Sequence, residues 1–159
     1  MFNQKLWNTS DYSTKWRPIF YDCDFSFGGK SANTLFQFFT GEGFTTRDGS
    51  KTNMWIPTAL KKNKSWCEKF LNRYSQVLKY YPEYSLELYD KMVEEMRPEM
   101  KRHIARWNLP RGGYSAWEDY VKNQRAIIKA RPEYLVKQIQ NVFNVPNDKM
   151  KELFPDIYN

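Results

Sequence analysis

The chain contains very little cysteine or histidine, and this shortage argues against several kinds of site. Cys23 and Cys67 are its only cysteines, and His103 is its only histidine. No C-x-x-C pair or cysteine–histidine ligand set is present, so a zinc site is not expected. Because Cys23 lies in a predicted strand, we interpret both cysteines as free thiols; a single disulfide between them is the alternative. His103 lies in a predicted helix with an apolar stripe, which is typical of a structural histidine, and no hydrolase nucleophile motif accompanies it.

Long apolar runs and glycine-rich phosphate loops are also missing. No stretch of about 18 apolar residues occurs, so no membrane span is predicted. The polar start, residues 1–5, is unlike a signal peptide and lacks a helix cap or strand of its own. We therefore expect the chain to begin inside a domain. Residues 28–31 (GGKS) lack the upstream glycine of a P-loop.

Composition predicts one globular domain with an aromatic core. The chain has 159 residues, of which 18% are aromatic, and a formal net charge of +7. Its basic residues are spread along the sequence, with one small run at residues 61–64. This spacing indicates solvated helix faces, and no nucleic-acid reader motif is present, so a nucleic-acid partner is not expected.

Apolar periodicity divides the chain into three parts. Residues 1–30 form a β element, in which Leu6-Trp7 and Pro18–Tyr21 pair as a hairpin. Residues 31–54 are predicted as a loop segment, with the short apolar run at 35–39 left open between helix and strand. Residues 55–159 are predicted as a helical lobe whose helices end near prolines. The expected fold class is α+β, mainly α: a small β-hairpin element followed by a bundle of five or six short helices.

The chemistry-bearing residues follow the second predicted strand. Asp22 and Asp24 are two residues apart, so on a strand both side chains point the same way. Such a pair repels itself unless a cation neutralises it or one acid keeps its proton, and carboxylates beside a loop suit Mg²⁺ or Mn²⁺. Turn or cap residues are the alternative interpretation of the same pattern. If the two strands pair, Asn3 approaches Asp22 from the neighbouring strand end and supplies an amide oxygen.

Three segments together resemble the CotH-type proteins, the spore-coat kinase family, an atypical branch of the protein-kinase-like fold. Trp16–Gly28 (WRPIFYDCDFSFG) is similar to the family's W-x-x-x-x-Y-D-x-D-[WF]-x-[FW]-G. Trp66–Tyr74 (WCEKFLNRY) is similar to a recurring F-x-x-x-F-x-x-R-[YLF] helix, and Arg97–Trp107 (RPEMKRHIARW) to R-P-E-M-x-R-H-x-x-R-W. With Trp117 and Arg131-Pro132, the resemblance runs over most of the chain.

The resemblance implies roles for individual residues. Asp22 matches the metal-binding Asp of the family, Asp24 assists or orients, and Asn3 is a second metal ligand. The catalytic Asp, five residues before that Asn, would fall before Met1, so no catalytic residue is expected in this chain. The N-terminal nucleotide-binding lobe would also be missing. The chain is thus expected to be the C-terminal, inactive part of a kinase-like domain.

In the intact protein, the resemblance implies phosphate transfer from Mg²⁺-bound ATP to Ser or Thr of a surface or coat protein. The implied partners are ATP and that protein substrate, and the implied location is extracellular or at the cell surface. A non-catalytic structural or interaction protein for surface or coat assembly is the alternative. A glycosyltransferase that binds Mn²⁺ through the two acids is a more distant one, because no Rossmann-like pattern is present.

Overall fold

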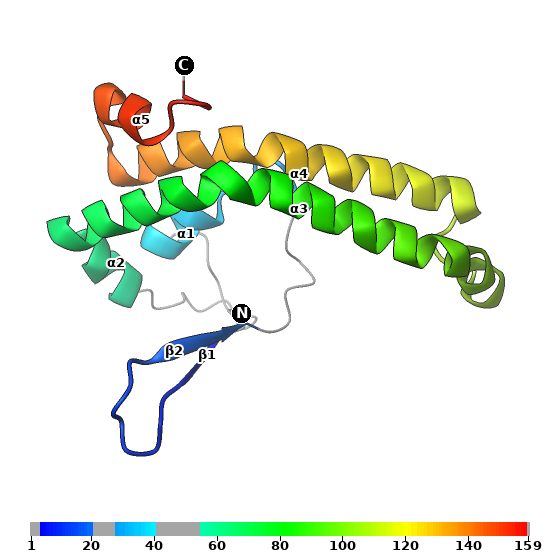
Figure 1. The fold of residues 1–159 in the computed structure, drawn as a ribbon, viewed down its shortest axis with the longest axis horizontal. Coiled ribbons are helices and arrows are strands. Elements are labelled where there is room, and N and C mark those ends of the chain that lie inside the picture. Colours follow the sequence, from blue (N-terminus) through cyan, green and yellow to red (C-terminus); the bar gives the residue numbers. More distant parts are fainter. Residues whose placement is uncertain (1–3, 21–27, 41–54, 159) are drawn as a thin grey trace.

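The computed structural model describes residues 4–20, 28–40 and 55–158. Within these ranges, two short strands come first and the remainder is helical (Figure 1). The elements in chain order are β1 (Gln4–Trp7), β2 (Arg17–Phe20), α1 (Thr34–Thr40), α2 (Trp55–Lys61), α3 (Lys64–Trp107), α4 (Gly113–Phe143) and α5 (Asn147–Leu153).

The molecule is built on two long antiparallel helices. Helix α3 has 44 residues, which corresponds to about 66 Å, and α4 has 31. The side chain of Asn63 accepts the Trp66 N–H and caps the start of α3, and Asn108 ends α3 with a left-handed φ of 52°. Gly112 then turns the chain with a φ of 96°, where a Cβ would lie 3.0 Å from the Cβ of Ala116. A glycine is therefore needed at this turn.

The predicted bundle of five or six short helices is wrong. Pro82 and Pro98 lie inside α3, and Pro132 lies inside α4, so none of them ends a helix. An interior proline removes one hydrogen bond and costs about 3 kcal/mol. Buried side chains on both sides of each proline offset this cost, because they hold the helix against its neighbour. These side chains are Leu78, Val93 and Met100 in α3 and Ile128 and Val136 in α4.

The two strands lie apart from the long helices. Strands β1 and β2 form a two-stranded antiparallel sheet, and Figure 1 shows this pair projecting away from the long helices. Every buried residue that the structure describes lies in a helix or in the residues directly after one. The expectation that the chain is mainly α is therefore confirmed, whereas the α+β class, in which the β element forms part of the fold's body, is wrong.

The described core has two clusters along the helix pair. The larger one joins α3, α4 and α5 around Val136, Ile139 and Met150, each at most 1% exposed. The smaller one lies near the turn between the long helices and contains Val93, Met100 and Trp117. In Figure 1, α5 lies on one side of the helix pair, and α1 and α2 lie on the other.

Helix α1 is attached to the long helices by aromatic side chains. It lies within the segment predicted as a loop, and Asn33 caps its start by accepting the Phe36 N–H at 3.0 Å. The Phe39 ring is 4.9 Å from that of Phe143 and 5.5 Å from that of Phe70, in edge-to-face arrangements. Phe39 is 2% exposed, so it joins α1 to both α3 and α4.

Candidate functional site

The predicted metal ligands lie in sequence just beyond the end of the strand pair where Gln4 and Phe20 are paired. The register places Gln4 opposite Phe20. Asn3 directly precedes Gln4, and Asp22 follows Phe20 by two residues, so the chain enters and leaves the strand pair at the same end. Asn3, Asp22 and the second acid, Asp24, themselves lie outside the described residues. Their assignment as metal ligands therefore stays a prediction.

The chain that follows the acidic segment is bonded to helix α4. Arg131 Nη1 donates to the carbonyl oxygen of Lys30 at 2.8 Å. Gln138 Nε2 donates to the carbonyl oxygens of Ser31 and Ala32 at 3.1 and 3.2 Å. Residues more than 100 positions apart in sequence are thus brought together. We call Arg131, Gln138 and Tyr134, whose ring lies 5.9 Å from the Lys30 ammonium, the α4 clamp.

Gln138 is an unusual residue for a helix core. It is 7% exposed, and its Oε1 is buried with no hydrogen-bond partner among the residues that the structure describes. Because Nε2 faces two carbonyl oxygens, the orientation of the amide is fixed and Oε1 must point the other way. A buried acceptor without a partner costs about 1–3 kcal/mol.

Burial also changes the protonation equilibria beside the clamp. Desolvation lowers the pKa of Arg131, while the neighbouring Tyr74 acts to raise it. Desolvation raises the pKa of Tyr74 to about 12, the charge of Arg131 opposes this, and Tyr81 adds a small increase. Tyr74 is therefore protonated at neutral pH.

The raised pKa of Tyr74 predicts an alkaline loss of stability. Its pKa of about 12 lies above the ordinary value of 10.0, so the folded state releases this proton later than the unfolded state. The stabilising contribution is complete below pH 10 and disappears as the pH rises to 12. We expect Tyr74→Phe to lose about 2 kcal/mol less unfolding free energy than the parent between pH 9 and 11.5. Urea unfolding at both pH values measures this difference.

Tyr120→Phe is the matched control, because this tyrosine is on the surface of α4 with 61% of it exposed. It should follow the parent chain at both pH values. Equal alkaline losses for the parent, Tyr74→Phe and Tyr120→Phe would contradict the assignment to Tyr74.

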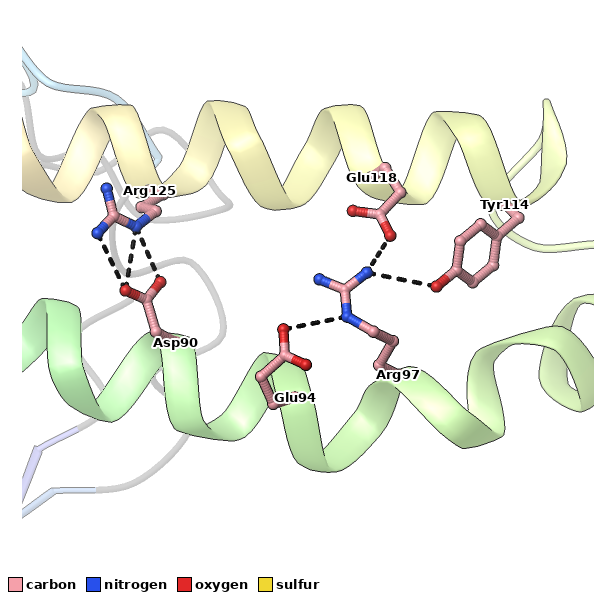
Figure 2. A network of polar contacts seen from close by, with 6 residues as sticks. All are labelled: Asp90, Glu94, Arg97, Tyr114, Glu118 and Arg125. Atoms are coloured by element: carbon pink, nitrogen blue, oxygen red, sulfur yellow. Dashed lines mark hydrogen bonds and ion pairs between the residues drawn. The ribbon is translucent and has the colours of Figure 1, made fainter.

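A polar network joins α3 to α4 near the turn (Figure 2). Arg97 donates to Glu94 at 3.0 Å and to the Tyr114 hydroxyl at 3.3 Å, and it forms an ion pair with Glu118. Its guanidinium also lies 5.2 Å from the Trp117 ring centroid. Arg97 is the first residue of the R-P-E-M segment that carries part of the resemblance. Its contacts with Tyr114, Trp117 and Glu118 show that this residue helps to hold α3 against α4.

A second ion pair joins the same two helices about two turns further along. The guanidinium of Arg125 donates to both carboxylate oxygens of Asp90, at distances between 2.9 and 3.1 Å (Figure 2). Tyr89 donates to the carbonyl oxygen of Val121 at 3.2 Å. These directional bonds set the register of α3 against α4.

The other conspicuous residues of the R-P-E-M segment show no catalytic arrangement. His103 is exposed on α3. Arg102 is paired with Glu99 at 3.0 Å, and the Arg106 guanidinium lies 4.7 Å from the Trp107 ring. Over residues 4–20, 28–40 and 55–158, no group of three His, Cys, Asp or Glu side chains is arranged for metal binding.

Cys67 is a free thiol, as expected from the sequence. Its sulfur lies 3.0 Å from the Lys61 carbonyl oxygen, and desolvation raises its pKa. Cys23 lies outside the described residues. Among the helices that the structure describes, none is long and apolar enough to cross a membrane.

The clamp is the feature that sequence reasoning missed. Residues Leu135, Ile139 and Val142 define the apolar stripe of this part of α4, and Gln138 lies on the same side. The sequence does contain one indication of the clamp: helical spacing predicts a buried position at Gln138, and a buried glutamine needs hydrogen-bond partners. Its partners are backbone carbonyls, however, and no side-chain pattern identifies them.

These observations define a mainly α protein with a strand pair, in which residues 30–32 are bonded to α4. Residues 1–135 match the protein family described as CotH kinase protein. The chain therefore belongs to the CotH kinase protein family, and the resemblance noted in the sequence is confirmed. No curated protein and no solved structure matches the chain.

Proposed function

We propose that this chain supplies the metal-binding edge of an ATP-dependent protein kinase of the CotH type. The observation that carries the proposal is the register of β1 and β2, in a chain that belongs to the CotH kinase protein family. This register places Gln4, which follows Asn3, opposite Phe20, which precedes Asp22 by two residues. A metal ion held at this end of the strand pair would have ligands from the residue before β1 and from the residues after β2.

The chemistry of the donor set fits Mg²⁺. Asp22 and Asp24 offer carboxylate oxygens and Asn3 offers an amide oxygen, and a hard cation such as Mg²⁺ binds oxygen ligands of this kind together with substrate phosphates. When bound, the ion neutralises the negative charge of the phosphates that ATP brings to the site. In this proposal Asp22 is the principal ligand, Asn3 is the second ligand, and Asp24 assists or orients.

The proposed acceptor is a Ser or Thr hydroxyl of a surface or coat protein, and the proposed location is extracellular or cell-surface. Both the acceptor and the location are proposed only because the chain belongs to the CotH kinase protein family. The positive net charge of +7 supports a partner that carries phosphate, because a basic surface attracts ATP.

Phosphate incorporation tests the proposal. The full natural protein is incubated with ATP and Mg²⁺, alone and with a surface-protein extract, and phosphorylated Ser and Thr are identified by mass spectrometry. We expect incorporation that disappears when EDTA removes the metal and when a non-hydrolysable ATP analogue replaces ATP. Absence of both incorporation and nucleotide binding would contradict the proposal. It would favour a structural or interaction protein of surface or coat assembly instead.

A further inference from the structure

A row of exposed apolar side chains runs along the second half of α3. Its five members are spaced four residues apart, and each is 43–56% exposed: Tyr80, Tyr84, Leu88, Met92 and Met96. We call these five residues the α3 row. Side chains four residues apart are neighbours on a helix, so the row forms one continuous ridge, about 24 Å long.

Leu88, the centre of the α3 row, lies on the side of α3 that faces away from α4. Asp90 and Arg97, which pair with α4, follow Leu88 by two and nine residues, which places both about half a turn around the helix from it. Phe70 precedes Leu88 by 18 residues, or five full turns, and therefore lies on the same side as Leu88. There Phe39 of α1 covers it, with the two rings 5.5 Å apart, and Figure 1 shows α1 and α2 beside the first half of α3. The side of α3 that α1 covers near its start is thus apolar and exposed further along.

The exposed surface of the α3 row is large enough for the centre of an interface. Half of five large side chains amounts to roughly 500 Å² of mostly apolar surface. Exposed apolar patches of this size often mark interaction sites, and a stable complex buries about 800 Å² on each partner. The row therefore supplies more than half of the area that a dimer needs, and the polar residues beside it can supply the remainder.

The order of residue types in the α3 row suits a second copy of the same helix. Two tyrosines precede Leu88 and two methionines follow it, at equal spacings. An antiparallel copy related by a two-fold axis at Leu88 has its Met92 opposite Tyr84 and its Met96 opposite Tyr80. The flexible methionine side chain fills space around an aromatic ring, and its sulfur makes favourable contacts with the ring. A parallel copy would place each residue opposite itself and would lose these contacts.

Charges beside the α3 row favour the same orientation. Lys91 is exposed, and its nearest acidic partner in its own chain is Glu95, at 3.9 Å. In the antiparallel arrangement, Lys91 lies opposite Ser85 of the second copy, about 3 Å along the helix from Glu87 of that copy. An ion pair between Lys91 and Glu87 then forms twice, once on each side of the axis. A parallel copy would instead bring like charges together, at a cost in free energy.

We propose that the α3 row is a dimer interface, in which α3 of one copy packs antiparallel on α3 of a second copy about a two-fold axis at Leu88. Ridges of side chains four residues apart interlock at a crossing angle of about 50°. Phe70 lies about 27 Å from Leu88 along α3, so a helix that crosses at this angle has moved clear of α1 there. The interface does not depend on the proposed metal site.

Sedimentation velocity of the full natural protein over a wide range of concentrations tests the interface, with the parent compared with Leu88→Glu. We expect the parent to change from monomer to dimer as its concentration rises. Leu88→Glu places two carboxylates at the axis, so the dissociation constant of the dimer should rise by at least about 30-fold. Circular dichroism should show unchanged helix content, because Leu88 is 43% exposed. A parent that is monomeric at every concentration, or a dimer that Leu88→Glu leaves unchanged, would overturn the proposal.

Tyr120→Glu is the matched control, because it places the same charge on an exposed aromatic residue of α4 that lies outside the row. It should form dimers as the parent does. If Leu88→Glu does not fold, exchanging charges at the flank decides the question. Lys91→Glu and Glu87→Lys should each weaken the dimer severalfold, and the double variant should restore it. Single variants that dimerise as strongly as the parent would contradict the antiparallel arrangement.

Introduced thiols distinguish a second copy from other occupants of the row. The two thiols of Leu88→Cys meet at the axis and should give a disulfide-linked dimer on oxidation, beyond any that the parent forms through its own cysteines. Those of Met96→Cys lie roughly 20 Å apart across the axis and should not. A monomeric protein in which the Leu88→Cys thiol resists alkylation would mean that another part of the same chain covers the row, and it would overturn the proposal.

Discussion

Replacing Asp22 by alanine is expected to lower the rate of phosphate transfer by about 100-fold or more. In the proposed site this carboxylate is the principal metal ligand, and phosphoryl transfer depends almost entirely on positioning and on neutralising charge. Removing one group that stabilises the developing charge commonly costs a factor of about 100 to 1,000 in rate. Initial rates of phosphate incorporation at saturating ATP, for the parent and the variant, measure the effect.

Asp148→Ala provides the matched control for this substitution. Asp148 is an exposed aspartate in the first turn of α5, so its removal takes away the same charge at a distance from the strand pair. Its rate should equal that of the parent. Circular dichroism should show the same helix content in both variants, because Asp22 lies in none of the described helices. Equal rates for Asp22→Ala and the parent would remove Asp22 from the proposed site.

Replacing Phe39 by alanine is expected to destabilise the protein by about 3–5 kcal/mol. Phe39 is 2% exposed and contacts the rings of Trp66, Phe70 and Phe143, so the truncation leaves a cavity where α1 meets both long helices. Part of the loss should appear locally, as faster hydrogen exchange in α1, because this side chain attaches a helix of seven residues. Equilibrium urea unfolding gives the global value.

Phe36→Ala is the control on the same helix. Phe36 is 39% exposed, so its truncation should change the unfolding free energy by much less. Similar losses for the two variants would mean that α1 is not held by the buried ring of Phe39 and would contradict the described packing.

The sequence predicts that residues 55–159 are helical, but it does not predict how long the helices are. The spacing of apolar residues from Trp66 onward indicated amphipathic helices, and these residues do lie in α3 and α4. Prolines at 82, 98 and 132 were interpreted as helix ends because each removes a backbone donor. That local cost is outweighed by long-range packing between α3 and α4, which a single sequence does not display.

Glu118 is a second case in which a contact between α3 and α4 overrides a local sequence pattern. With Ser115 it has the spacing of a capping box, which predicts a helix that begins at Ser115. Helix α4 instead begins at Gly113, after Gly112, and Glu118 forms an ion pair with Arg97 of the neighbouring helix. The Glu118 carboxylate thus pairs with a residue 21 positions away in sequence and not with the start of its own helix.

Part of the candidate site could be predicted from the sequence and part could not. The acidic pair and its place after a strand could be found from residue types and spacing, and family membership is in agreement with the segments that suggested it. The clamp could not be found in this way. Arg131 and Gln138 bind backbone carbonyl oxygens of residues 30–32, and a carbonyl is present at every residue, so nothing in the sequence of 28–33 marks it as an acceptor.

The central claim, that the segment after β2 holds a divalent metal, is tested most directly by titrating Mn²⁺ into the full natural protein with ATP present. Electron paramagnetic resonance counts the free ion, and the parent is compared with Asp22→Ala and with the control Asp148→Ala. We predict one saturable site in the parent and in Asp148→Ala, and its loss in Asp22→Ala. Equal Mn²⁺ binding by all three proteins would contradict the claim.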